Sequence, residues 1–179
     1  MFALLNLTGE RRASAGPSRG SIIPALACSR DLDAVGERWS TLETASYAPF
    51  RLIVATVTEV SVFTRSARLP HRVPLATSLY CSSSLGDDTV TEPRRSLFAG
   101  LLATSSDPWH AQDRLHQHAW PDRRHLSVLM SRTDAATVSR TEVVLDAERV
   151  SMRYAAVIDG WPAAIAAPPL TLSRGRMAA

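Results

Sequence analysis

The sequence predicts a mainly β protein with two or three short helices in the connections between its strands. Segments rich in valine, isoleucine and threonine recur along the chain, and the longest covers residues 51–65. In most of these segments apolar and polar side chains alternate, which is the period of a half-buried strand. The 179 residues contain no internal repeat or interdomain linker. We therefore expect a single domain over residues 1–179, with a partly irregular tail at 161–179.

The first third of the chain is expected to form two strands and one helix. Residues 1–7 are largely apolar and predict a first strand. Residues 22–28 are also apolar, and Pro24 restricts them to an edge strand. Within 31–44 the apolar residues recur every three or four positions, which predicts a helix with one buried face: Leu32, Val35, Trp39 and Leu42.

The middle third is expected to contain two long strands followed by two helical segments. Residues 51–65 predict one long central strand, and the alternation over 73–81 predicts a second. A helix is expected at 92–104, where a threonine, an acid and an early proline provide a start signal. Asp107 followed by proline repeats that signal for a helical segment that ends before Pro121.

The last third is expected to be β-rich. Alternating apolar residues predict strands at 125–131, 137–145 and 150–158. The four residues 146–149 predict a hairpin connection between the last two of these strands. One more short strand is expected at 170–172.

The charged residues restrict the chemistry of this protein. All 20 basic residues are arginines, against 17 acidic residues, for a net charge of +3. The absence of lysine excludes Schiff-base lysine catalysis and a phosphate-binding loop of the Walker type. We attribute it mainly to a GC-rich coding bias, with which the single asparagine, Asn6, agrees. Arginine also pairs with phosphate in a two-pronged geometry, so this surface is compatible with nucleic acid.

The cysteines and the N-terminus carry little functional information. Cys28 and Cys81 match no metal-binding or redox spacing, so we expect two reduced, buried thiols. The apolar run at residues 1–7 is too short for a secretory signal, and no apolar run reaches the length of a membrane span. We therefore expect a soluble, intracellular protein.

Four of the five histidines lie close together in the sequence, beside three aspartates. A zinc site needs three or four converging ligands of these types. On a helix His110, Asp113 and His118 would share a face, whereas an extended 116–118 would bring His116 and His118 together. No HExxH spacing occurs. Two interpretations stay open. Either His110, His116 and His118 form a metal site, or the histidines are solvated.

Two other groups of residues have alternative interpretations. Asp87 and Asp88 could bind a hard cation such as calcium or form a turn before the following helix. The arginines are spread over loops and strand ends, which is typical of a solvated surface or of diffuse phosphate contact. No serine lies in a Gly-x-Ser-x-Gly elbow, so a catalytic triad is not expected.

The order of the expected elements is strand, strand, helix, two long strands, a helical excursion and a run of strands. This order resembles the coat proteins of small icosahedral positive-strand RNA viruses of plants, of the tymovirus, sobemovirus and tombusvirus type. The local pattern is similar as well, because Tyr47-Ala48-Pro49-Phe50-Arg51-Leu52 leads into the valine-rich strand and Glu92-Pro93 precedes the helix. The resemblance covers about residues 2–172. It implies an antiparallel jelly-roll-like β-sandwich with short helices at 31–44 and 92–104.

The resemblance implies a structural capsid subunit that is not an enzyme. Such a subunit self-assembles into the icosahedral shell of a virion around viral RNA, in the host cytoplasm. Its partners would be further copies of itself and RNA, contacted through phosphates without sequence specificity, and no membrane. Arg11, Arg12 and Arg19 are the RNA-contact candidates. No cofactor is expected other than Ca²⁺ at subunit interfaces, which the resemblance places at Asp87 and Asp88.

Two other classes of function stay open. One is an α+β metal- or ligand-binding protein or enzyme of a GC-rich bacterium, which would use the cluster from His110 to His125. A stoichiometric transition metal in the purified protein would favour this class. The other is an accessory protein that interacts with host components and has no catalytic activity.

Overall fold

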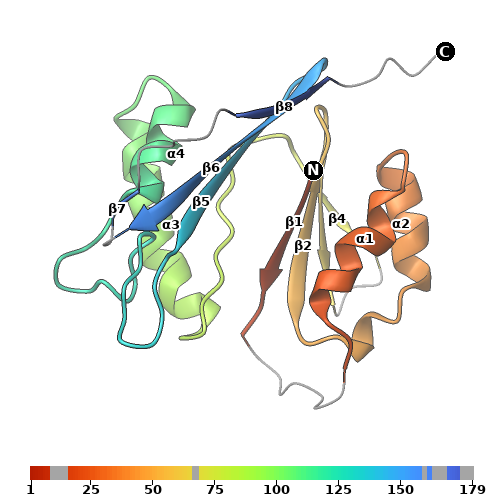
Figure 1. Ribbon diagram of the computed structural model, residues 1–179, viewed down its shortest axis with the longest axis horizontal. Helices are drawn as coiled ribbons and strands as arrows, with labels where there is room; N and C mark the ends of the chain where they lie inside the picture. Colours follow the sequence, from red (N-terminus) through yellow and green to blue (C-terminus); the bar gives the residue numbers. More distant parts are fainter. Residues whose placement is uncertain (9–15, 66–68, 159–160, 163–168, 174–179) are drawn as a thin grey trace. The chain divides into compact units, whose positions relative to one another are not determined.

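The computed structural model describes residues 1–8, 16–65, 69–158, 161–162 and 169–173. The chain divides into two compact units, Met1–Asp88 and Thr89–Ala179 (Figure 1). The expectation of a single domain over residues 1–179 stays a prediction. None of the described helices is both long enough and apolar enough to cross a bilayer.

The expected jelly-roll-like sandwich is wrong, because the described residues form a mixed α+β structure. They contain four α-helices and two separate small antiparallel sheets. A jelly roll forms its core between two facing sheets. Here the buried face of the first sheet instead packs against helices of its own unit.

The first unit consists of one four-stranded sheet and two short α-helices, with β1 and β2 drawn beside α1 and α2 in Figure 1. The strands pair in the order β1-β2-β3-β4, and every pair is antiparallel. The elements are β1 (Phe2–Asn6), the 3-10 helix η1 (Arg19–Ser21), α1 (Ile22–Ala27), α2 (Leu32–Thr41), the 3-10 helix η2 (Thr44–Ser46), β2 (Phe50–Ala55), β3 (Val60–Thr64) and β4 (His71–Val73).

The core of the first unit lies between α1, α2 and one face of the sheet. Alternate residues of β2 are buried, as the two-residue period of a strand requires. Trp39 of α2 lies 5.7 Å from Phe50 and 4.9 Å from Phe63, measured between ring centroids. The helix and first strand expected from the sequence are thus confirmed, and Asp31 caps α2 by accepting a hydrogen bond from the Ala34 amide.

Three strand predictions in the first unit are wrong. Most of the segment 22–28 forms α1, because Pro24 lies in the first helical turn, where the missing N–H costs nothing. Residues 51–65 form a hairpin of two strands rather than one strand. The hydroxyl of Thr56 accepts hydrogen bonds from the amides of Thr58 and Glu59 and so stabilises the turn between them.

The third wrong prediction is the long strand at 73–81. Only β4 forms there, and it ends at Val73 because Pro74 has no N–H to donate to a neighbouring strand. The residues that follow are irregular, and Leu75 is exposed. Their alternation therefore does not reflect a buried face.

The second unit contains two α-helices and the second sheet, in which β5 and β6 form a long antiparallel pair (Figure 1). Strand β6 also pairs with β7 and β8. The elements are α3 (Asp87–Ala103), which begins at the last residues of the first unit, α4 (Pro108–His116), β5 (Ser139–Leu145), β6 (Arg149–Ile158), β7 (Trp161–Pro162) and β8 (Leu170–Ser173).

Most predictions for the second unit are confirmed, including β5, β6, β8 and the start of α4 at Asp107. The connection at 146–149 is a hairpin, in which the carboxylate of Asp146 accepts hydrogen bonds from two following amides. Helix α3 begins five residues before the expected 92. The strand at 125–131 is wrong, since this segment forms turns that end in a single bridge between Ser131 and Ala136.

Candidate functional site

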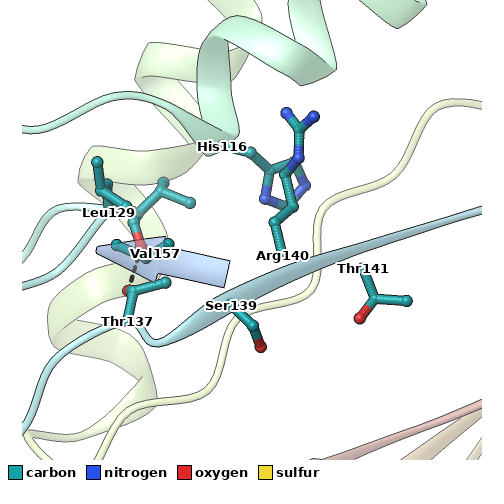
Figure 2. A pocket seen from close by; sticks show the side chains of 8 residues that line it. His116, Leu129, Thr137, Ser139, Arg140, Thr141 and Val157 are labelled. Carbon is teal, nitrogen blue, oxygen red and sulfur yellow. Dashed lines mark hydrogen bonds between the residues drawn. The ribbon is translucent and has the colours of Figure 1, made fainter. Parts of the chain in front are cut away.

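A cavity of about 140 Å³ lies in the second unit, beside the end of α4 and the start of β5 (Figure 2). Apolar and hydroxyl-bearing side chains form most of its wall, together with one imidazole and one guanidinium. The lining residues are His116, Val128, Leu129, Thr137, Ser139, Arg140, Thr141 and Val157.

His116 and Arg140 reach this cavity from different elements. His116 is the last residue of α4, and Asp113 lies one helical turn before it. The alternation of β5 places Arg140 and Glu142 on one face of the sheet. Figure 2 shows the His116 ring beside the Arg140 side chain. The cavity thus brings together a basic side chain from the sheet and a titratable one from the helix.

An ion pair fixes the position of Arg140. Its Nη1 donates to Oδ1 of Asp113 at 2.6 Å, and the side chain of Arg140 is only 18% exposed. Within the described part of the chain, no other hydrogen bond engages this guanidinium. Because arginine carries five N–H donors, donors remain for a ligand in the cavity.

Burial lowers the pKa of His116, and the positive charge of Arg140 lowers it further. The carboxylates of Asp113 and Glu142 act in the opposite direction. His116 is therefore neutral at neutral pH. In this form one ring nitrogen donates a hydrogen bond and the other accepts one, so the cavity has a single fixed positive charge, that of Arg140.

A larger cavity of about 530 Å³ adjoins the first one and shares Leu129, Thr137 and Val157 with it. Its wall is mostly apolar and includes four polar side chains, those of Gln117, Arg124, Ser131 and Thr137. The other residues of this wall are Ala119, Pro121, Met130, Ala136 and Val138. The two cavities together place the Arg140 guanidinium next to a larger, mostly apolar compartment.

Side-chain hydrogen bonds hold the irregular segment that separates α4 from β5. Arg94 of α3 donates to the carbonyl oxygens of Leu126 and Ser127, at 2.9 and 2.7 Å. The hydroxyl of Thr137 donates to the Val128 carbonyl at 3.0 Å and accepts from the Met130 amide at 2.9 Å. These bonds stabilise turns that have no strand partners, so the cavity wall has a defined shape.

The three RNA-contact candidates are not brought together among the described residues. Arg11 and Arg12 lie outside these residues. Arg19 belongs to η1, and its Nη1 donates to the Pro49 carbonyl at 2.8 Å. This bond gives Arg19 a structural role in the first unit.

Asp87 and Asp88 lie in the first turn of α3. The carboxylate of Asp87 accepts hydrogen bonds from the amides of Ser83 and Thr8, at 2.9 and 3.2 Å. Acids at this end of a helix are favoured by its unpaired N–H groups and its dipole. The observed contacts of Asp87 are therefore those of a structural residue at the start of a helix.

The histidines of the cluster are dispersed over the second unit. His110 is exposed on α4, 3.9 Å from the carboxylate of Asp107, and His125 is exposed in the following turns. His118 lies beyond the end of α4, with its ring edge against Trp120 and its Nε2 buried without a hydrogen-bond partner among the described residues. In the part of the chain that the structure describes, no three histidine, cysteine, aspartate or glutamate side chains form a group that could hold a metal ion.

The sequence indicates His116 as a candidate residue but not its association with Arg140. The ion pair of Arg140 with Asp113 joins residues 27 positions apart, which no local spacing reveals. One signal was present, because the apolar positions Val143 and Leu145 place Arg140 on the opposite face of β5. Which element covers that face depends on long-range packing.

Comparison with models of known protein families gives no match, and comparison with curated proteins gives none either. The resemblance to plant-virus coat proteins thus stays a prediction from the order of elements.

Proposed function

We propose that the second unit binds a small amphipathic carboxylate, with its head group at Arg140 and its apolar part in the larger cavity. The observation that carries the proposal is the adjacency of the two cavities, of which the smaller contains Arg140 and His116 and the larger is mostly apolar. Ligand sites are commonly apolar cavities with a few polar groups that orient the ligand. The larger cavity, at about 530 Å³, has the volume of such a site.

The charges around the smaller cavity favour a carboxylate over a phosphate as the head group. Arg140 presents planar N–H donors that match the two oxygens of a carboxylate. Asp113 and Glu142 lie near enough to His116 to influence its pKa. A doubly charged phosphate would be repelled by both acids, whereas a singly charged head group is repelled less.

Isothermal titration calorimetry of the full chain with octanoate, octan-1-ol and acetate tests this proposal. Octanoate carries both the charge and the apolar chain, octan-1-ol lacks the charge, and acetate lacks the chain. We expect octanoate to bind more tightly than either of the other two. Equal binding of octanoate and octan-1-ol, or no binding of octanoate, would contradict the proposal.

A matched pair of arginine variants locates the charge that binds the head group. Arg140→Gln removes a charged hydrogen bond worth about 1.5–3 kcal/mol, so it should weaken octanoate binding roughly 10- to 100-fold. Arg149→Gln is the control, because Arg149 lies on the same sheet, is exposed and lines neither cavity. Equal effects of the two variants would argue against a head-group site at Arg140.

A capsid subunit that encloses RNA remains a separate hypothesis from the order of elements. The β-sandwich that this resemblance implied is absent from the described residues, so the cavity pair supports ligand binding better. Electron microscopy of the purified protein with RNA tests the capsid hypothesis. Closed particles would support it, and a uniform population of small species would contradict it.

A further inference from the structure

The second sheet has one face with exposed apolar side chains. This apolar sheet face consists of Val143 of β5, Val150, Met152 and Tyr154 of β6, and Leu170 and Leu172 of β8. Strand register places these residues together, because Met152 lies opposite both Val143 and Leu170, and Val150 lies opposite Leu172. Residues directly opposite each other in a sheet point to the same side.

The other face of the sheet is different in character. It includes Arg140 and Glu142 of β5, Arg153 of β6 and the buried Ala155. The ion pair of Arg140 with Asp113 on α4 belongs to this side. The apolar sheet face is thus the side of β5 opposite the side chain of Arg140.

The exposed area of the apolar sheet face equals that of the largest apolar patch on a typical monomer. Met152, Tyr154, Leu170 and Leu172 are between 40% and 59% exposed. Together they present on the order of 400 Å². The largest apolar patch of a typical monomer measures about 300–600 Å² and often has a function.

We propose that two copies of this chain associate face to face through the apolar sheet face. Two copies would bury on the order of 800 Å² from these four side chains alone, and specific interfaces bury about 1,200–2,000 Å² in total. The half-buried Val143 and Val150 and the surrounding residues extend the contact toward this range.

The absence of charge favours a second copy over another partner. On this side of the sheet β5, β6 and β8 carry no charged residue, because every position of the three strands that faces it is apolar or hydroxyl-bearing. Around a twofold axis each patch meets an identical patch, so a charged residue at its centre would face its own like charge. Depletion of charge at the centre is also the typical composition of homodimer interfaces.

Sedimentation velocity of the full chain from about 1 to about 100 µM, a range that detects micromolar association, tests the proposal directly. The average mass should rise with concentration from the 19.5 kDa of one chain toward twice this value. A mass that stays at one chain over the whole range would overturn the proposal.

Two glutamate variants of β8 test which surface associates. Leu170→Glu places a charge on the apolar sheet face and should weaken association at least about tenfold. Thr171→Glu places the same charge at the next residue, which is also exposed but points to the other side. It should leave association within about twofold of the wild type. Circular dichroism verifies folding, and Leu170→Ser replaces Leu170→Glu if the latter unfolds. Equal weakening at Leu170 and Thr171 would show that another surface is used.

Discussion

Replacing Trp39 by alanine tests the packing of helix α2 on the first sheet. The side chain of Trp39 is 2% exposed and contacts the rings of Phe50 and Phe63. A buried tryptophan removes about 200 Å² from water, which at about 25 cal/mol per Å² corresponds to about 5 kcal/mol. The alanine that remains recovers part of this, and measured costs for such substitutions are about 3–5 kcal/mol. We therefore expect Trp39→Ala to lower the free energy of unfolding by about 4 kcal/mol.

Urea denaturation followed by far-ultraviolet circular dichroism measures this loss without depending on tryptophan fluorescence. Trp109→Ala is the matched control, because Trp109 also lies in a helix but is 55% exposed. Its cost should stay below about 1 kcal/mol. If Trp39→Ala costs less than about 1 kcal/mol, or no more than the Trp109 variant, the packing of α2 described here is refuted.

Three further predictions concern the second unit. Folding lowers the pKa of His116 below the ordinary 6.5. Between these two pKa values the unfolded chain binds more protons than the folded chain, so the contribution of His116 to stability should fall as pH falls through this window. An NMR titration should show the pKa of His116 rising in Arg140→Gln, and an unchanged pKa would contradict the electrostatic coupling. Arg94→Ala should speed amide hydrogen exchange in residues 124–131 roughly tenfold, whereas unchanged exchange would refute the role of its two hydrogen bonds. Asp107→Ala removes the N-cap of α4 and should cost about 1 kcal/mol in urea denaturation, and no measurable loss would contradict the cap.

Local patterns predicted the elements that have strong local signals. The helical spacing that includes Val35 and Trp39 predicted α2, and the aspartate-proline pair at 107 predicted the start of α4. Strands β5 and β6 were predicted by alternation, together with their hairpin connection at Asp146. In each case the residues that form the element also specify its start, its period or its end.

Short apolar segments and weak turns were beyond local reasoning. Residues 22–28 are too few for periodicity to distinguish a strand from a helix. The turn after Ala55 contains no glycine, proline or asparagine, and the Thr56 hydroxyl stabilises it instead. The long strand expected at 51–65 therefore became two, and this error contributed to the incorrect jelly-roll prediction.

The candidate site was predictable only in part. The sequence indicated His116 as one of several histidines with possible chemistry, but it gave no reason to separate it from His110 or His118. The distinction comes from α4 ending at His116, so that the ring lines the cavity beside Arg140 while His118 lies outside the helix. The pairing of Arg140 with residues of α4 depends on how β5 packs, and no sequence motif predicts it.

The most direct test of the proposed ligand site is an NMR map of the amide shifts that octanoate causes in the full chain. The proposal predicts saturable shifts at residues that line the two cavities, including His116, Leu129 and Arg140, with little change at Leu52 in the core of the first unit. No saturable shifts at the cavity residues, or shifts concentrated at Tyr154 and Leu170 of the apolar sheet face, would contradict it.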